Sequence, residues 1–174
     1  MVASKSFQVG DMAVYPAHGV GEIKGIESKE IAGHIRNFYI MKILESDMTV
    51  MIPTENVAKA GLREIIPSRK VKEVWDILKE RDIEIDTQTW NRRYREYIEK
   101  IKTGSIFEIA EVMRDLSLLS LNKELSFGER KMLETARKLI TKEIAIAMDV
   151  DEPKVSEKID KIFTPPPQPI VAHA

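Results

Sequence analysis

The sequence predicts an α+β fold of two domains: a small antiparallel β-barrel followed by an all-α domain of about five helices. Two observations lead to this class. The chain changes character near Pro67, because most glycines and the short β-branched runs precede it, whereas apolar residues recur with a helical period after it. The chain also has 174 residues, of which 43% are hydrophobic, and this is enough for two small domains with a core each.

Five short strands are predicted before Pro67, and each is separated from the next by residues that favour turns. They cover residues 11–15, 20–31, 36–44, 48–53 and 62–66. Strands this short expose unpaired backbone groups unless the sheet closes on itself. We therefore expect a closed barrel of the SH3 or Tudor type, which occupies residues 1–67.

Two helices are predicted next, and each begins at a residue that can cap it. Ser68 caps the first helix, in which one face carries Val71, Val74, Trp75 and Leu78. We expect Trp75 to be buried, since it lies among apolar neighbours in the middle of that helix. Thr89 caps the second helix, in which one face carries Trp90, Tyr94, Ile98 and Ile101.

Three further helices complete the predicted second domain, which occupies residues 68–163. The segments 105–108 (SIFE) and 126–129 (SFGE) have the spacing of capping boxes, and the second of them opens the longest helix. Pro153 suits the first turn of the last helix. The Pro-rich tail, residues 164–174, is expected to be extended and flexible.

No pattern in the sequence points to catalysis or to a bound metal. The chain has no cysteine, which excludes disulfides, thiol nucleophiles and Cys-ligated metal sites. Its three histidines, His18, His34 and His173, lie far apart and match no metal-binding spacing. The glycines of residues 18–25 belong to turns and strands and do not form a phosphate-binding loop. We predict no enzyme activity, no catalytic residue, no metal and no cofactor.

The charges are distributed unevenly along the chain. The formal net charge is −1, which excludes a uniformly basic protein but not a basic face. Residues 91–102 carry a net charge of +3, and Trp90 directly precedes them. Arginine matches phosphate oxygens and an indole stacks on a base, so this composition is typical of nucleic-acid binding. The alternative is that Trp90 and Tyr94 belong to the core and the arginines form a solvated face.

Seven short motifs follow one another in the chain: 9–11 (VGD), 14–16 (VYP), 18–21 (HGVG), 48–53 (MTVMIP), 90–94 (WNRRY), 110–116 (AEVMRDL) and 125–130 (LSFGER). In order and spacing this set resembles the CarD/CdnL family of bacterial transcription regulators. The N-terminal domain of that family is shared with the RNA-polymerase-interacting domain of transcription-repair coupling factors. The resemblance extends from about residue 7 to residue 163.

The resemblance implies a Tudor-like domain that binds the RNA polymerase β subunit and a helical domain that contacts promoter DNA at the upstream edge of the transcription bubble. The family tryptophan at the position of Trp90 acts as a wedge in the minor groove. The DNA-binding residues so implied are Trp90, Arg92, Arg93, Arg95, Arg130 and Lys131. The polymerase-binding residues so implied are Lys29, Met51, Ile52 and Pro53. Some family members carry an arginine where this chain has Met51, so we expect apolar docking at that strand.

The sequence therefore predicts a non-enzymatic, monomeric transcription regulator that binds polymerase and stabilises the open promoter complex without base-specific readout. The chain has no apolar run long enough to cross a membrane, and its first residues lack the apolar core of a secretory signal. We expect a cytoplasmic protein that is associated with the nucleoid through RNA polymerase. The alternative is a protein–protein adaptor whose helical domain makes no direct contact with DNA.

Overall fold

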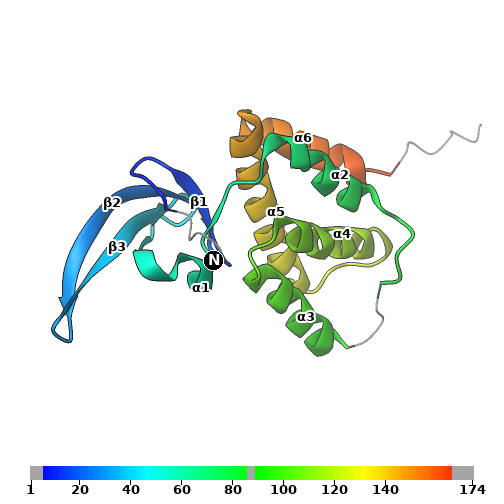
Figure 1. Ribbon diagram of the computed structural model, residues 1–174. Helices are drawn as coiled ribbons and strands as arrows, with labels where there is room; N and C mark the ends of the chain where they lie inside the picture. The colour runs from blue at the N-terminus through cyan, green and yellow to red at the C-terminus, as the bar shows by residue number, and fades with distance from the viewer. Residues whose placement is uncertain (1–5, 86–88, 166–174) are drawn as a thin grey trace, which may run out of the picture.

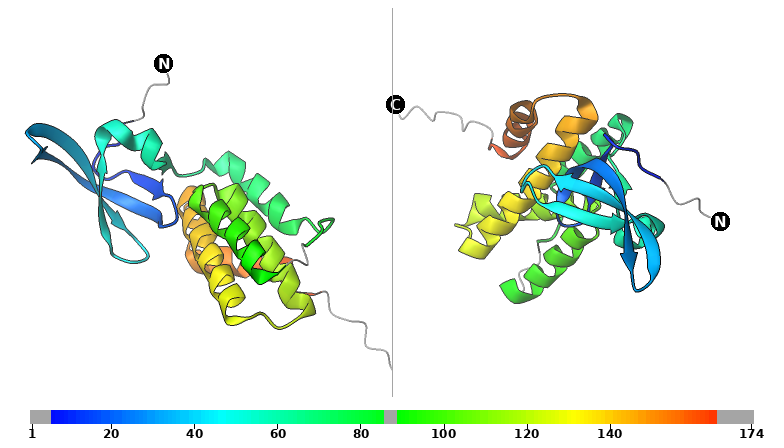
Figure 2. Two further views of the ribbon diagram at one scale, coloured as in Figure 1. Left: turned by 90° about the horizontal axis from the view of Figure 1, so that it is seen from below. Right: turned by 90° about the vertical axis from the view of Figure 1, so that its left-hand side faces the viewer.

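The computed structural model describes residues 6–85 and 89–165, which form a β-sheet domain and a helical domain joined end to end (Figures 1 and 2). The strands are β1 (Met12–Tyr15), β2 (Gly19–Ile31), β3 (His34–Ile43), β4 (Thr49–Pro53) and β5 (Arg63–Glu64). They form one antiparallel sheet in the order β4-β3-β2-β1-β5. All five predicted strands are present, and the predicted α+β class is confirmed.

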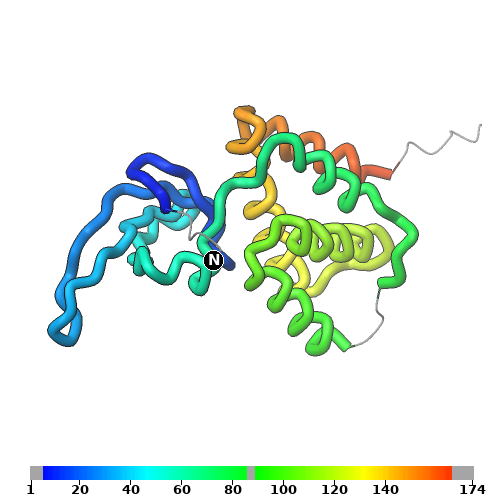
Figure 3. Tube along the Cα trace, in the orientation of Figure 1, coloured from blue at the N-terminus to red at the C-terminus, as the bar shows by residue number. Residues whose placement is uncertain are grey.

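The β2–β3 hairpin is the longest feature of the sheet and extends away from the helices (Figure 3). Its two-residue turn consists of Ala32 and Gly33, both with positive φ, as expected for a turn that matches the twist of the strands. Because the turn is this tight, the pairing continues to Ile31 and His34, and β3 begins two residues earlier than predicted.

The strands form the expected small antiparallel sheet domain, but the two strands at its edges do not pair to close it. β4 and β5 lie at opposite edges of the sheet and are not paired with each other, so within the described residues β4 has one free edge. The open side is instead covered by a 3₁₀ turn (Thr54–Asn56) and the short helix α1 (Val57–Ala60), which inserts Val57 into the core. Four residues are too few to give a periodic signal in the sequence, so α1 was not predicted.

Five α-helices follow within the described residues, as expected. They are α2 (Val71–Lys79), α3 (Trp90–Lys102), α4 (Ile106–Asn122), α5 (Phe127–Met148) and α6 (Glu152–Phe163). α4 packs against α2, α3 and α5, and its buried side chains include Ile109, Val112, Met113 and Leu116. Trp75 on α2 is 8% exposed, which confirms the prediction that it belongs to the core.

One of the two predicted capping boxes is present. At the start of α5 the hydroxyl of Ser126 accepts from the backbone N–H of Glu129, and the carboxylate of Glu129 accepts from the backbone N–H of Ser126. At the start of α4 the box is absent, because the backbone N–H of Ser105 donates to the hydroxyl of Thr103 and leaves no donor for Glu108. The same spacing therefore gives a cap only where no competing acceptor lies nearby.

The two domains are joined through Arg63 at the end of the sheet. Its guanidinium donates to both carboxylate oxygens of Glu143 on α5, at 2.6 and 2.8 Å, and to the carbonyl oxygen of Gly104 at 2.7 and 2.9 Å. The same carboxylate accepts from the backbone N–H of Ile66 at 3.0 Å. The Glu143 side chain is only 4% exposed, so its charge depends on these donors.

Close backbone packing supports the same junction. Pro16, in the turn between β1 and β2, lies against Gly104, where an added Cβ would approach Pro16 to 3.2 Å. Gly104 also has a φ of +72°, which side chains disfavour. A side chain at this position would push apart the sheet and the end of α3.

The predicted division after residue 67 falls between β5 and the 3₁₀ turn (Ser68–Lys70) that precedes α2. The predicted flexible tail lies outside the described residues except for residues 164–165. No helix within the described residues is long and apolar enough to span a bilayer.

We predict that Arg63→Met lowers the free energy of unfolding by about 3 kcal/mol, because Glu143 would be left as a buried charge without its main partner. Urea denaturation followed by circular dichroism measures this change. The matched control is Lys72→Met, which removes an exposed ion pair with Asp76 and is expected to leave stability unchanged. Equal effects of the two substitutions would contradict a structural role for Arg63.

Candidate nucleic-acid interface

Trp90 is the first residue of α3, and this helix begins at the side of the helical domain that lies away from the sheet (Figure 1). Its indole is half-buried: one side packs on the helical core, and the rest is open to solvent. The sequence allowed two interpretations, an exposed indole that stacks on a base or a residue of the core. The observed ring lies between them, because it is partly buried. A half-buried ring has a fixed orientation and still offers a surface to a partner.

Three neighbours define the surroundings of the indole. The ring of Tyr94, one turn further along α3, meets it edge to face with centroids 5.5 Å apart. The guanidinium carbon of Arg93 lies 5.7 Å from the ring centroid. On the opposite helix, Gly128 leaves room for the ring, since an added Cβ would lie 3.3 Å from Nε1 and Cζ2 of Trp90. The first turn of α5 therefore supports the wedge candidate.

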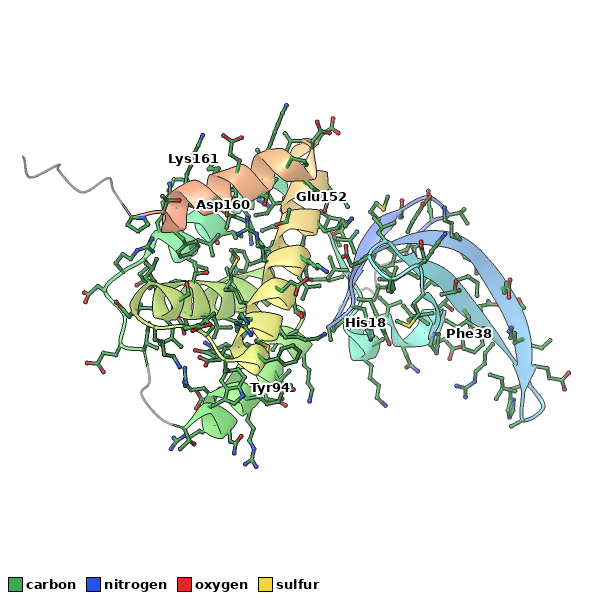
Figure 4. The ribbon with its side chains drawn as sticks, turned by 180° about the vertical axis from the view of Figure 1, so that it is seen from behind. His18, Phe38, Tyr94, Glu152, Asp160 and Lys161 are labelled. Carbon is green, nitrogen blue, oxygen red and sulfur yellow. The ribbon has the colours of Figure 1, made fainter. Side chains whose placement is uncertain are left out.

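The predicted face of α3 requires a correction. Of the four residues placed on one face, Ile101 is buried, and Trp90 and Ile98 are partly buried against the core. Tyr94 leaves this set, and the other buried positions are Arg93 and Tyr97. Tyr94 is 43% exposed and lies where α3 meets α5 (Figure 4). The helix is rotated so that Tyr97 enters the core. The sequence signal for this rotation was that Tyr97, an aromatic residue, lies one helical turn after Arg93.

The prediction that Arg93 is a surface residue available to DNA is also corrected, because its side chain is buried. Its side chain is 10% exposed and lies beside the carboxylate of Glu129, with Nη1 and Oε2 3.8 Å apart. It is hydrogen-bonded to Tyr97, whose hydroxyl pKa is raised to about 12 by burial and by the charge of Asp115. Arg93 thus faces a carboxylate and a neutral phenol, and its guanidinium is not presented at the surface for a phosphate. Composition alone does not distinguish it from the two exposed arginines beside it.

The other four predicted cations are exposed on α3 and α5. Arg92 lies 3.8 Å from Glu96, and Arg130 lies 3.8 Å from Glu124, both at distances too long for a strong hydrogen bond. Arg95 and Lys131 form no ion pair with any residue that the structure describes. Arg92 and Arg95 lie two and five residues after Trp90, so they point to other sides of α3 than the indole. Arg130 and Lys131 follow Gly128, the residue of α5 that contacts the indole.

One exposed residue near Trp90 was not predicted. Phe127, the first residue of α5, is 74% exposed. Together with Tyr94 and Lys131 it lines a shallow groove of about 420 Å³ between α3 and α5. The sequence placed Phe127 within a capping box, and this local signal says nothing about its exposure.

The predicted polymerase-binding residues lie on or near the free edge strand β4. Met51 is 40% exposed, and its sulfur lies 3.5 Å from Nζ of Lys29 on β2, so these two side chains form one surface. Pro53 is half-buried at the end of the strand. Ile52 is corrected: it is 1% exposed and points into the sheet core, so only its backbone is available to a partner.

No metal site or catalytic arrangement emerges in residues 6–85 and 89–165. That part of the chain contains no group of three or more His, Asp or Glu side chains able to hold an ion. His18 stacks on Tyr15, with ring centroids 5.3 Å apart, and its backbone N–H closes a turn on the same residue. These contacts place His18 in the turn between β1 and β2.

The fold and the site together define a two-domain binding protein: a sheet with a free edge, tied to helices that present a tryptophan among cations. Residues 7–66 match the family model of the CarD-like/TRCF RID domain, and residues 73–160 match that of the CarD C-terminal domain. The protein YdeB of Bacillus subtilis (strain 168), named as a transcription factor, is 35% identical over 149 residues, which cover 86% of this chain and 97% of that protein. The chain belongs to the CarD-type family of transcription factors.

A solved structure is also similar in part. "CdnLNt from Myxoccoccus xanthus" is 55% identical to the aligned region, which covers 36% of this chain and 87% of that structure, with a TM-score of 0.31.

Glu129 gives a pH-dependent prediction. Burial alone would raise the pKa of its carboxyl, but hydrogen bonds from Ser126 and the cation of Lys123 outweigh burial, and the pKa lies below its ordinary value. A lowered pKa means that Glu129 stabilises the fold above its ordinary pKa and that this stabilisation is lost as pH falls through the lowered value. Glu129→Gln should therefore show a shallower loss of stability below about pH 4.5. Thermal melts between pH 3 and 7 measure the difference, and parallel curves for the two proteins would contradict it.

Proposed function

We propose that this transcription factor binds the RNA polymerase β subunit through the β4 edge of its sheet and stabilises the open promoter complex through Trp90. The observation that carries the proposal is the half-buried indole at the start of α3, which packs on Gly128 of α5, with exposed cations on both helices. Arg92, Arg95, Arg130 and Lys131 would contact phosphates on either side of the indole. The indole would occupy the space that the upstream base pair needs in order to reform.

The energetics favour a tethered wedge over an independent DNA binder. Unstacking one base step costs a few kcal/mol, which a single indole does not recover with a large surplus. Four phosphate contacts give an affinity that falls steeply with salt. Binding through the sheet raises the local concentration of the helical domain at the promoter, so a weak DNA contact becomes effective. The formal net charge of −1 agrees with recruitment by a protein.

The β4 edge suits a protein partner for two reasons. A free edge strand offers unpaired backbone groups to which another strand can be added. The side chains beside this edge, Met51 and Lys29, combine an exposed thioether with a long apolar stem. We propose that Ile52 contributes its backbone alone and that Met51 and Pro53 make the apolar contact.

We predict that Met51→Lys in the full-length protein weakens polymerase binding about ten-fold, because a charge would be desolvated in an apolar contact. Lysine is chosen because Lys29 lies next to the site and would neutralise an acidic side chain. Biolayer interferometry with immobilised polymerase measures the affinity. Leu121→Lys, at another exposed apolar position on α4, is the control and should bind like the wild type. Unchanged binding of Met51→Lys would exclude β4 as the docking edge.

We predict that Trp90→Ala shortens the lifetime of the open complex by at least about five-fold, because stacking on a base contributes on the order of 1–3 kcal/mol. The lifetime is measured on a linear promoter fragment after addition of a competitor. Since Trp90 is half-buried, Trp90→Phe is tested in parallel: it keeps a ring on Gly128 and should give an intermediate lifetime. If both variants fold, bind polymerase and leave the lifetime unchanged, the adaptor function without DNA contact is correct instead.

A further inference from the structure

Arg93 differs from the other arginines of α3 because its charge is buried. A buried guanidinium is unfavourable unless a carboxylate and hydrogen bonds compensate it. The compensating carboxylate, Glu129, is itself only 3% exposed and comes from a different helix. Two oppositely charged groups are therefore placed together inside the domain, directly behind Trp90.

Glu129 holds several groups at once. Its Oε1 atom accepts from the backbone of Ser126 at 3.2 Å and from Nζ of Lys123 at 3.1 Å, which fixes the carboxylate at the first turn of α5. Its Oε2 atom is buried and forms no hydrogen bond with the described residues, and Nη1 of Arg93 lies 3.8 Å away. The carboxylate is thus anchored through one oxygen and directs its other oxygen at Arg93.

The same pair of helices fixes the indole. Gly128, the residue before Glu129, lies under the ring of Trp90, and the guanidinium of Arg93 lies 5.7 Å from the ring centroid. A cation near the face of an indole is attracted by it. Any movement of Arg93 or of the first turn of α5 would release the ring from one of these two contacts.

We infer that Arg93 and Glu129 are positioning residues: they hold the indole of Trp90 in one orientation, and Arg93 does so without contacting DNA. The consequence for open-complex stability rests on the proposed function of Trp90. A wedge acts only in the orientation that blocks the upstream base pair, so a ring that reorients freely loses part of its effect to entropy. The pair therefore acts on DNA through Trp90.

The orientation of the ring is tested without DNA. In a Trp75→Phe background Trp90 is the one tryptophan, so fluorescence anisotropy and iodide quenching report on it alone. Glu129→Gln removes the charge that faces Arg93 but keeps an acceptor for the capping box. We expect iodide quenching to rise by about two- to five-fold, the change that loss of one cation–π contact allows. Glu108→Gln, at the same position of α4, is the matched control and should leave quenching unchanged.

A second variant protects the test against misfolding. Arg93→Lys keeps a buried charge for Glu129 but loses the planar guanidinium, so it should fold and still show raised quenching of Trp90. If quenching and anisotropy in both folded variants equal those of the parent, the pair does not position the indole and the inference is wrong.

The absence of a direct DNA contact is tested by salt dependence. The affinity of the polymerase-bound protein for a fork-junction promoter fragment is measured at several salt concentrations. Arg95→Met should reduce the slope of log affinity against log salt by about one, as expected for a lost phosphate contact. Arg93→Met should lower the affinity and leave the slope unchanged. Equal reductions in slope for the two variants would show that Arg93 contacts phosphate and would overturn the inference. If Trp90→Ala has no effect on DNA, the wedge proposal fails, and the quenching data still decide the positioning role.

Discussion

The geometry of this protein depends on the contact between Arg63 and the helical domain. One guanidinium from β5 binds the buried carboxylate of Glu143 on α5 and the carbonyl of Gly104 at the end of α3. These are the two helices that hold Trp90: α3 carries it, and α5 supports it through Gly128. A single residue of the sheet therefore fixes both elements on which the candidate wedge is built. The bidentate geometry restrains direction as well as distance, which a single hydrogen bond would not do.

This arrangement gives each domain a distinct physical task. In the proposed function, a partner binds to the free edge of the sheet. The free energy of that binding would come from backbone hydrogen bonds and apolar contact. α3 then acts as a rigid arm: its 13 residues span about 20 Å from the clamp at Gly104 to the indole at Trp90. In the proposed complex, a rigid arm would preserve the position that polymerase binding imposes on the sheet. With a flexible joint the indole would sample a larger volume, and its effective concentration at the DNA would fall.

The sequence was sufficient to predict the strands and helices, because the signals for them are local in the chain. Turn residues and period-2 runs located five strands, and helical periodicity located five helices, with boundaries that differ by one or two residues. Features that depend on residues far apart in the chain could not be predicted from the sequence. Arg63 and Glu143 are 80 residues apart in the chain, and neither has a neighbour that marks it as part of a junction. Burial of Arg93 depends on Glu129, the inward position of Ile52 depends on the register with Tyr39, and the failure of the box at Ser105 depends on Thr103.

Arg63 and Arg93 differ from the exposed cations of α3 and α5 in the carboxylates that they face. Cations whose role is structural, Arg63 and Arg93, face carboxylates that are almost completely buried, Glu143 and Glu129. The exposed cations of α3 and α5 have long, exposed pairs, as Arg92 and Arg130 do, or none within the described residues, as with Arg95 and Lys131. Long exposed pairs contribute little to stability, so these side chains are free to exchange a carboxylate for a phosphate at small cost. A buried pair does not exchange its partner in this way, because separating it leaves an uncompensated charge inside the domain. The distribution of paired and available cations thus separates the residues that build the domain from those that the proposed function assigns to DNA.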